Sequence, residues 1–352
     1  MGAWVLYGPA SFVGDPSFGT GYLGLISYSL FTGLPLIMIA FMGTYIRKNV
    51  PRATSIASFG RWRFGFLAEI FIMLIVMFNL GVALTAEYTA IGGIFNDFFG
   101  VPLVGPYFGC WTCHHVIHRN WWSLSMSIMV VAVFSLGSLL AYWSGRATEL
   151  DNSNFGFFLA FRDSNGAISS AMLIIVILFA VIMNESAIDS FQNAITDSVV
   201  SILGSFGVKF PTIAARLLVI LFNVPLMYVG TLNLSVIGVF LLGNMLTACT
   251  FLPLASGLIP ALNRIVSQYS VILACLFAFF SVMVYGKMTT GSVSEGLILY
   301  WTTTYDMNAF LVSSISSVVW LAVFSSIETV VRRIYNWPIP HPSESSKVSA
   351  LI

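Results

Sequence analysis

Long runs of apolar residues, each long enough to span a lipid bilayer, constrain this chain more than any other feature of its sequence. A helix needs about 20 apolar residues to cross the hydrocarbon core. The seven clearest runs cover residues 20–46, 64–92, 123–144, 167–198, 213–231, 234–257 and 268–288, and an eighth, interrupted by serines, covers 308–329. Only 8% of the 352 residues are charged, whereas soluble domains carry about 25%. The sequence therefore predicts an all-α integral membrane protein with about eight to ten transmembrane segments.

The charge and the motif content exclude several classes of function. The formal net charge is +1, so the chain has no broad basic face for nucleic acid. Cys249 and Cys275 lie within apolar runs, where a thiol behaves as a small hydrophobe. The sequence contains no phosphate-binding loop, no nucleophile elbow and no HExxH zinc motif. We therefore expect no enzymatic activity, no cofactor, no nucleic-acid partner and no obligate protein partner.

Basic residues gather between the apolar runs and indicate how these cross the membrane. Arginine and lysine are enriched in cytoplasmic loops, which places residues 47–63, 200–212, 258–267 and the C-terminus on the cytoplasmic side. Counting the runs leaves the chain one crossing short before residue 199. The proline- and glycine-broken stretch around 100–120 is the natural place for that crossing. We expect a plasma-membrane protein whose last residues, 336–352, form a disordered cytoplasmic tail.

Ionisable side chains inside apolar helices are costly and usually mark function. Glu69 and Glu87 lie in the 64–92 run, and two more acidic residues lie in the 167–198 run. There the helical spacing of three and four residues gives a polar stripe formed by Glu185, Asp189, Gln192, Asn193 and Thr196, beside a second one formed by Ser186, Ser190, Asn193 and Asp197. These oxygen donors suit an alkali cation or a proton. The alternative is a polar contact that holds helices together.

Asp15 lies in a segment, residues 14–22, whose glycines and proline forbid a continuous helix. Transporters often bind their substrate where a helix unwinds in this way. The alternative is an ordinary extracellular loop that precedes the next helix.

The motif Cys110-Trp111-Thr112-Cys113-His114 matches the CxxCH pattern of c-type haem attachment. With His118 nearby, it also offers ligands for zinc. The motif is short and has no companion cluster elsewhere in the sequence, so we interpret it as a loop without a metal. A membrane redox protein built on this motif is the remaining alternative.

Several segments resemble the sodium:solute symporter family, and within it the fungal urea-transporter-like branch. The similar segments are residues 11–24, 52–65, 84–102, 186–197 and 240–258. The resemblance implies a LeuT-like inverted-repeat helix bundle that takes up a small polar solute, with urea among the candidates. It also implies Na⁺ or H⁺ as the coupling ion.

The resemblance further implies which residues form the site. In that family the first and eighth core helices share the sodium site, and the corresponding positions here lie near Trp4 and Tyr7 and at Ser186 and Ala187. With the polar stripe added, the predicted ion-coupling residues are Trp4, Tyr7, Met183, Glu185, Ser186, Ala187, Asp189 and Ser190. The predicted substrate-binding residues are Ser11, Asp15, Thr32 and Asn193.

The stretch between the third and eighth core helices is shorter here than the resemblance requires. Residues 100–166 offer too few crossings, in the stretch where the count of charged connections also fails. We therefore expect an incomplete bundle within one transmembrane domain over residues 1–335. An ion-coupled symporter working by alternating access is the leading hypothesis, and a degenerate or truncated non-transporting protein derived from such a symporter is the alternative.

Overall fold

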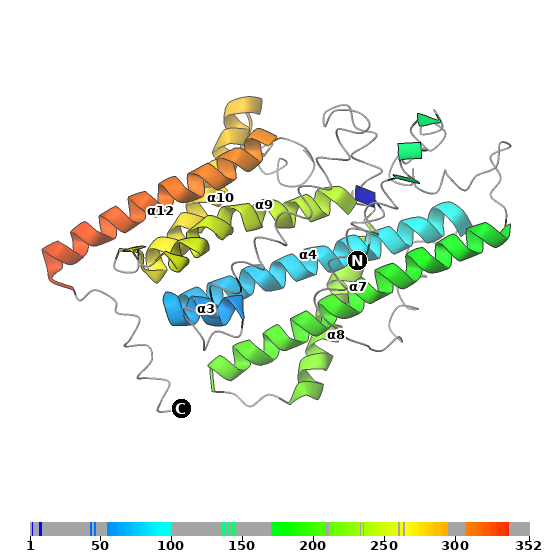
Figure 1. Ribbon diagram of the computed structural model, residues 1–352, viewed down its shortest axis with the longest axis horizontal. Coiled ribbons are helices and arrows are strands. Elements are labelled where there is room, and N and C mark those ends of the chain that lie inside the picture. Colours follow the sequence, from blue (N-terminus) through cyan, green and yellow to red (C-terminus); the bar gives the residue numbers. More distant parts are fainter. Residues whose placement is uncertain are drawn as a thin grey trace. The chain divides into compact units, whose positions relative to one another are not determined.

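The computed structural model describes residues 55–99, 170–207, 211–232, 236–259, 265–294 and 307–337, together with scattered positions elsewhere. Within these ranges the chain is helical and contains no strand. The elements are α3 (Ile56–Arg63), α4 (Phe66–Phe99), α7 (Ser170–Ser205), α8 (Thr212–Gly230), α9 (Val236–Ala255), the 3-10 turn η5 (Ser256–Leu258), α10 (Gln268–Thr290) and α12 (Met307–Tyr335), as Figure 1 shows.

Five helical segments in the described part of the chain are long and apolar enough to cross a membrane. They are Phe66–Asn96, Ile213–Gly230, Val236–Leu258, Gln268–Thr290 and Asn308–Tyr335. Large apolar side chains project outward from them, including Leu74 at 60% exposure and Leu221 at 72%. Exposed apolar surface on this scale is typical of a protein surrounded by lipid and not of one surrounded by water. The prediction of an all-α, multi-pass membrane protein is confirmed at this level, whereas the predicted runs 20–46 and 123–144 fall almost wholly outside the described residues.

The polar connection predicted over residues 47–63 contains a helix in its second half. Helix α3 begins after Ser55, whose hydroxyl accepts a 3.0 Å hydrogen bond from the backbone N–H of Ser58, while the Ser58 hydroxyl accepts one of 2.8 Å from the N–H of Ser55. This capping box supplies partners for N–H groups that the first helical turn leaves unpaired. Gly65, at φ +126°, then turns the chain into α4.

Helices α8, α9 and α10 begin and end within two residues of their predicted limits, whereas α7 and α12 end seven and six residues beyond theirs. Helix α10 starts at the N-cap Ser267 and ends at Gly291, which adopts the left-handed conformation at φ +84°. Helices α8 and α9 contain Pro225 and Pro253 in their interiors. Each proline removes one backbone hydrogen-bond donor from its helix.

The chain divides into two compact units. Unit one comprises Met1–Ile39, Gly81–Ile195 and Leu217–Phe240, and unit two comprises Ala40–Leu80, Thr196–Arg216 and Leu241–Ile352. The transmembrane domain predicted over residues 1–335 covers parts of both, and its single-domain character stays a prediction.

In unit two, α10 and α12 pack along each other (Figure 1). The main core of this unit joins α3 and α4 to both helices through Phe59, Phe64, Ala68, Val266, Val271, Ala274, Cys275 and Leu321. In unit one, α4 packs against α8, because Gly81 lies in contact with Phe222 and Leu226. Each unit therefore has a buried interior.

Candidate functional site

The second half of α4 is buried on all sides. From Leu84 to Gly92 every residue is buried, whereas a helix at the edge of a bundle buries only one stripe. This stretch includes Thr85, Glu87, Tyr88 and Thr89, and Glu87 is only 1% exposed. A carboxyl group, a phenol and two hydroxyls therefore lie within a segment that is long and apolar enough to cross a membrane.

The hydroxyls of this stretch are held by α4 itself and by two neighbouring helices. Thr85 and Thr89 donate to the carbonyl oxygens of Gly81 and Thr85, at 3.0 and 2.9 Å. Thr89 also lies 3.5 Å from the carbonyl oxygen of Gly230, the last residue of α8. On another side, the amide of Gln192 on α7 donates to the Tyr88 hydroxyl at 3.3 Å. The side chains of α4 thus link α7 and α8 within unit one.

Two residues near the N-terminus, Gly2 and Tyr7, also lie against this stretch of α4. The Tyr7 hydroxyl donates a 2.8 Å hydrogen bond to the carbonyl oxygen of Ala90, and the Tyr7 side chain is 2% exposed. Gly2 lies so near Glu87 that a Cβ atom there would overlap the carboxylate. Tyr7 was predicted as an ion-coupling residue, and the structure places it against α4 near Glu87.

The predicted stripe on α7 falls mostly beside its buried face, and of its five members only Thr196 is buried. Helix α7 buries a row of mostly apolar residues spaced three, four and seven apart: Ile177, Ala180, Asn184, Ala187, Ile188 and Ile195. Of the predicted residues, Met183, Glu185 and Asp189 are partly buried, and Ala187 is buried. Ser186, Ser190 and Asn193 are exposed, and the Ser190 hydroxyl donates to the carbonyl oxygen of Ser186 at 2.8 Å.

Asn184 was missed by the sequence analysis, although it precedes Glu185 directly. It is 0% exposed, and neither its Oδ1 nor its Nδ2 has a hydrogen-bond partner among the residues that the structure describes. Asn223 on α8 is also buried, with its Oδ1 unpartnered within the same ranges. An unpartnered buried polar group costs about 1–3 kcal/mol, so each amide calls for a functional or structural reason. The sequence signal for Asn184 was its place in a row of apolar residues at helical spacing on α7.

The other predicted residues lie outside the described part of the chain. These are Trp4, Ser11, Asp15 and Thr32, together with Cys110, Cys113, His114 and His118. Among the residues that the structure does describe, no group of three or more histidine, cysteine, aspartate or glutamate side chains is placed to hold a metal ion. The predicted pairing of the first helix with α7 at a sodium site therefore stays a prediction.

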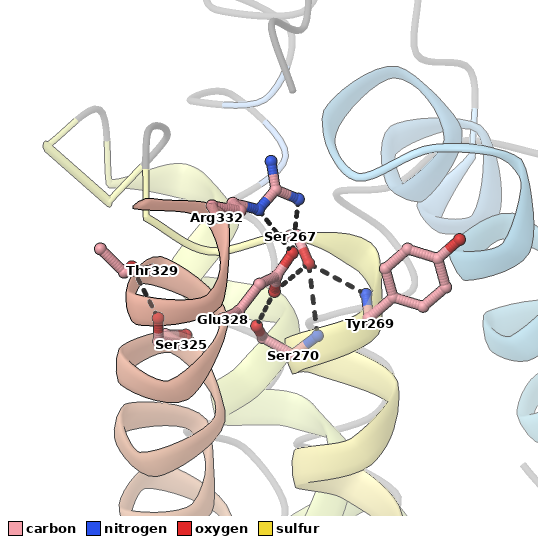
Figure 2. Close-up of polar contacts among 7 residues, drawn as sticks. All are labelled: Ser267, Tyr269, Ser270, Ser325, Glu328, Thr329 and Arg332. Carbon is pink, nitrogen blue, oxygen red and sulfur yellow. Dashed lines mark hydrogen bonds and ion pairs between the residues drawn. The ribbon is translucent and has the colours of Figure 1, made fainter. Parts of the chain in front are cut away.

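Unit two holds charged residues of its own near one end of α10 and α12. Glu328 on α12 accepts hydrogen bonds from the hydroxyls of Ser267 and Ser270 on α10, as Figure 2 shows. Arg332 donates from Nε to the same carboxylate at 3.0 Å. Ser267 also caps α10, since its hydroxyl accepts from the N–H groups of Tyr269 and Ser270 at 3.2 and 3.4 Å. These contacts tie the start of α10 to the last part of α12.

Two arginines of α3 also lie in unit two. Arg61 forms an ion pair with Glu69, at 3.4 Å between Nη1 and Oε2. Arg63 is buried and donates from Nε to the carbonyl oxygen of Gly257 at 3.0 Å. The sequence analysis placed both arginines in a polar connection on the cytoplasmic side, which stays a prediction, and the structure adds that Arg63 is buried.

A comparison of the chain with models of known protein families found no match, and neither did a search of curated proteins. The resemblance to the sodium:solute symporters therefore stays a prediction, and function must be argued from the residues themselves.

Proposed function

We propose that this protein is an ion-coupled secondary transporter of a small polar solute. Glu87, together with Tyr88 and Gln192, forms the centre of the proposed transport site in unit one. Urea is one candidate solute, and Na⁺ or H⁺ is the coupling ion. The finer architecture that we propose is a LeuT-like inverted-repeat bundle in the plasma membrane with a cytoplasmic C-terminus.

The burial of Glu87 is the single observation that carries this proposal. Its carboxyl group is 1% exposed within Phe66–Asn96, a segment fit to cross a membrane. Ionisable groups at such positions are rare, and they mark ion, proton and substrate paths. A carboxyl group serves either coupling ion, because it can bind a proton or supply two hard oxygen ligands to Na⁺.

Neighbouring groups supply the hydrogen bonds that a polar solute needs. Tyr88 and Gln192 already form a hydrogen bond that joins α4 to α7. Asn184 adds one unpartnered donor group and one unpartnered acceptor within the same unit. A solute that replaces water at such groups gains affinity because it satisfies amides that are otherwise costly to bury.

Helix α7 contributes a second set of acidic groups. Glu185 and Asp189 are partly buried on successive turns, so movement of α7 would change the water access of both carboxylates together. In an alternating-access cycle this change would alter their affinity for the coupling ion. We therefore retain Asp189 beside Glu87 as a coupling residue.

Transport should be measured with the full chain reconstituted in liposomes. An inward Na⁺ gradient and an inward H⁺ gradient are imposed separately, and uptake of labelled urea, proline and glucose is followed against protein-free liposomes. Accumulation above the equilibrium level under one gradient supports the proposal. Uptake that responds to neither gradient, for any of these solutes, would leave the non-transporting alternative in its place.

A further inference from the structure

Arg63 is a buried cation at the end of α3 in unit two. Its side chain is 8% exposed, and its guanidinium carbon lies 5.1 Å from the centre of the Phe64 ring, over its face. Nε donates to the carbonyl oxygen of Gly257 at 3.0 Å. Nη2 has no hydrogen-bond partner among the residues described. Among the described residues, the guanidinium therefore donates to one acceptor, the uncharged carbonyl oxygen of Gly257.

Three carboxylates are described in unit two: those of Glu69 and Glu328 are engaged with other arginines, and that of Asp197 is exposed. Glu69 pairs with Arg61 at 3.4 Å, and Glu328 pairs with Arg332. Burial lowers the pKa of Arg63 to about 10, and among the described residues no carboxylate offsets this effect. Arg63 therefore remains charged at neutral pH, and among the residues that the structure describes no carboxylate serves as its counter-ion.

A buried charge without a partner is strongly unfavourable, so buried arginines are normally paired with an anion. The planar guanidinium matches phosphate oxygens especially well, because it can donate two parallel hydrogen bonds. Arg63 presents one engaged nitrogen and one unpartnered nitrogen. An oxyanion such as phosphate would supply the acceptor that Nη2 lacks.

The place of Arg63 in the chain also suits a phosphate. It lies three residues before Phe66, where a segment fit to span the membrane begins, and phospholipid headgroups occupy that boundary. Ser267, the N-cap of α10, follows Val266, which packs with Phe64 in one core cluster. The N-terminal end of α10 already holds the Glu328 carboxylate, so Arg63 itself is the group that would bind the phosphate.

We propose that Arg63 is the anchor of a phosphate-binding site at the junction of α3, η5 and α10. The phosphate is carried either by an anionic phospholipid or by a free phosphate ion. The site is independent of the proposed transport site, because Arg63 belongs to unit two.

The test compares wild type with Arg63→Met and with Arg333→Met, which removes an exposed arginine of α12. Thermal stability of each full-length protein is measured in an uncharged maltoside detergent alone, with added phosphatidylglycerol, and with added inorganic phosphate. The midpoint of wild type and of Arg333→Met should rise with at least one additive, and that additive identifies the source. Arg63→Met should lose this rise, with binding weakened about tenfold or more, because a charge-assisted hydrogen bond is removed.

Native mass spectrometry gives a second readout, since bound phospholipid or phosphate should be retained by wild type and lost from Arg63→Met. If Arg63→Met does not fold, Arg63→Lys replaces it; the lysine keeps the charge without the two-pronged geometry and should bind phosphate more weakly than wild type. Equal gains in wild type and in the Arg63 variants, or no gain in wild type with either additive, would overturn the proposal.

Discussion

The hydroxyl of Tyr7 donates a 2.8 Å hydrogen bond to the backbone carbonyl oxygen of Ala90, so a residue near the N-terminus is fixed to the buried stretch of α4. The two residues are 83 positions apart in the sequence. Removing the hydroxyl leaves the ring in place and tests this bond alone.

Tyr7→Phe should lower the free energy of unfolding by about 1 kcal/mol, the usual net contribution of one hydrogen bond. It should also slow gradient-driven uptake, because Tyr7 lies against the stretch that contains Glu87. The measurement is the unfolding midpoint in detergent together with the initial uptake rate. Tyr228→Phe is the matched control, since Tyr228 on α8 is 68% exposed, and it should change neither quantity.

Glu87→Gln should abolish accumulation of solute against its gradient while leaving the protein folded in the membrane. Glutamine keeps the shape of the side chain but cannot take up and release a proton or balance the charge of Na⁺. Exchange of labelled for unlabelled solute at equal concentrations should persist more strongly than accumulation. Wild-type accumulation by Glu87→Gln would remove this carboxyl group from the coupling mechanism.

Asp189→Ala should abolish uptake without reducing the amount of protein inserted in the membrane. Asp189 is partly buried on α7, so its loss should have little effect on packing. Asp189→Asn separates charge from size and should behave as the alanine variant does. Uptake at the wild-type rate in both variants would exclude Asp189 from the site.

Asn184→Leu should stabilise the protein and stop transport at the same time. The amide has no hydrogen-bond partner among the described residues, so an apolar side chain of similar volume removes a desolvation cost of about 1–3 kcal/mol. A higher unfolding midpoint with unchanged uptake would show that Asn184 has no part in binding. A higher midpoint with lost uptake is the expected result.

Glu328 and Arg332 should show a favourable coupling of about 1 kcal/mol in a double-mutant cycle. The cycle compares Glu328→Gln, Arg332→Met and the double variant by unfolding in detergent. The expected value exceeds that of an exposed helical pair because both side chains are less than a fifth exposed. Additive single effects would mean that the ion pair contributes nothing, and that Glu328 acts through Ser267 and Ser270 alone.

Sequence alone predicts the long helices well because bilayer-length apolar runs are an unambiguous signal. It predicts poorly which side of each helix is buried. Apolar side chains lie on both the exposed and the buried side of α7, so hydrophobicity does not distinguish the two sides. The predicted stripe through Glu185 therefore lies one residue, or about 100° of helix rotation, from the buried row through Asn184. The positive-inside rule likewise located Arg63 near the membrane boundary but could not show that its side chain is buried.

The all-round burial of α4 from Leu84 to Gly92 also bears on how the protein is made. A nascent chain delivers α4 to the membrane before α7 and α8 have been synthesised. Until those helices arrive, Tyr88 lacks the Gln192 amide and Thr89 lacks the Gly230 carbonyl that they contact in the finished fold. The apolar first half of α4 must hold the helix in the bilayer during this interval. Biosynthesis of this protein should therefore depend on the insertion machinery retaining α4 until its later partners are translated.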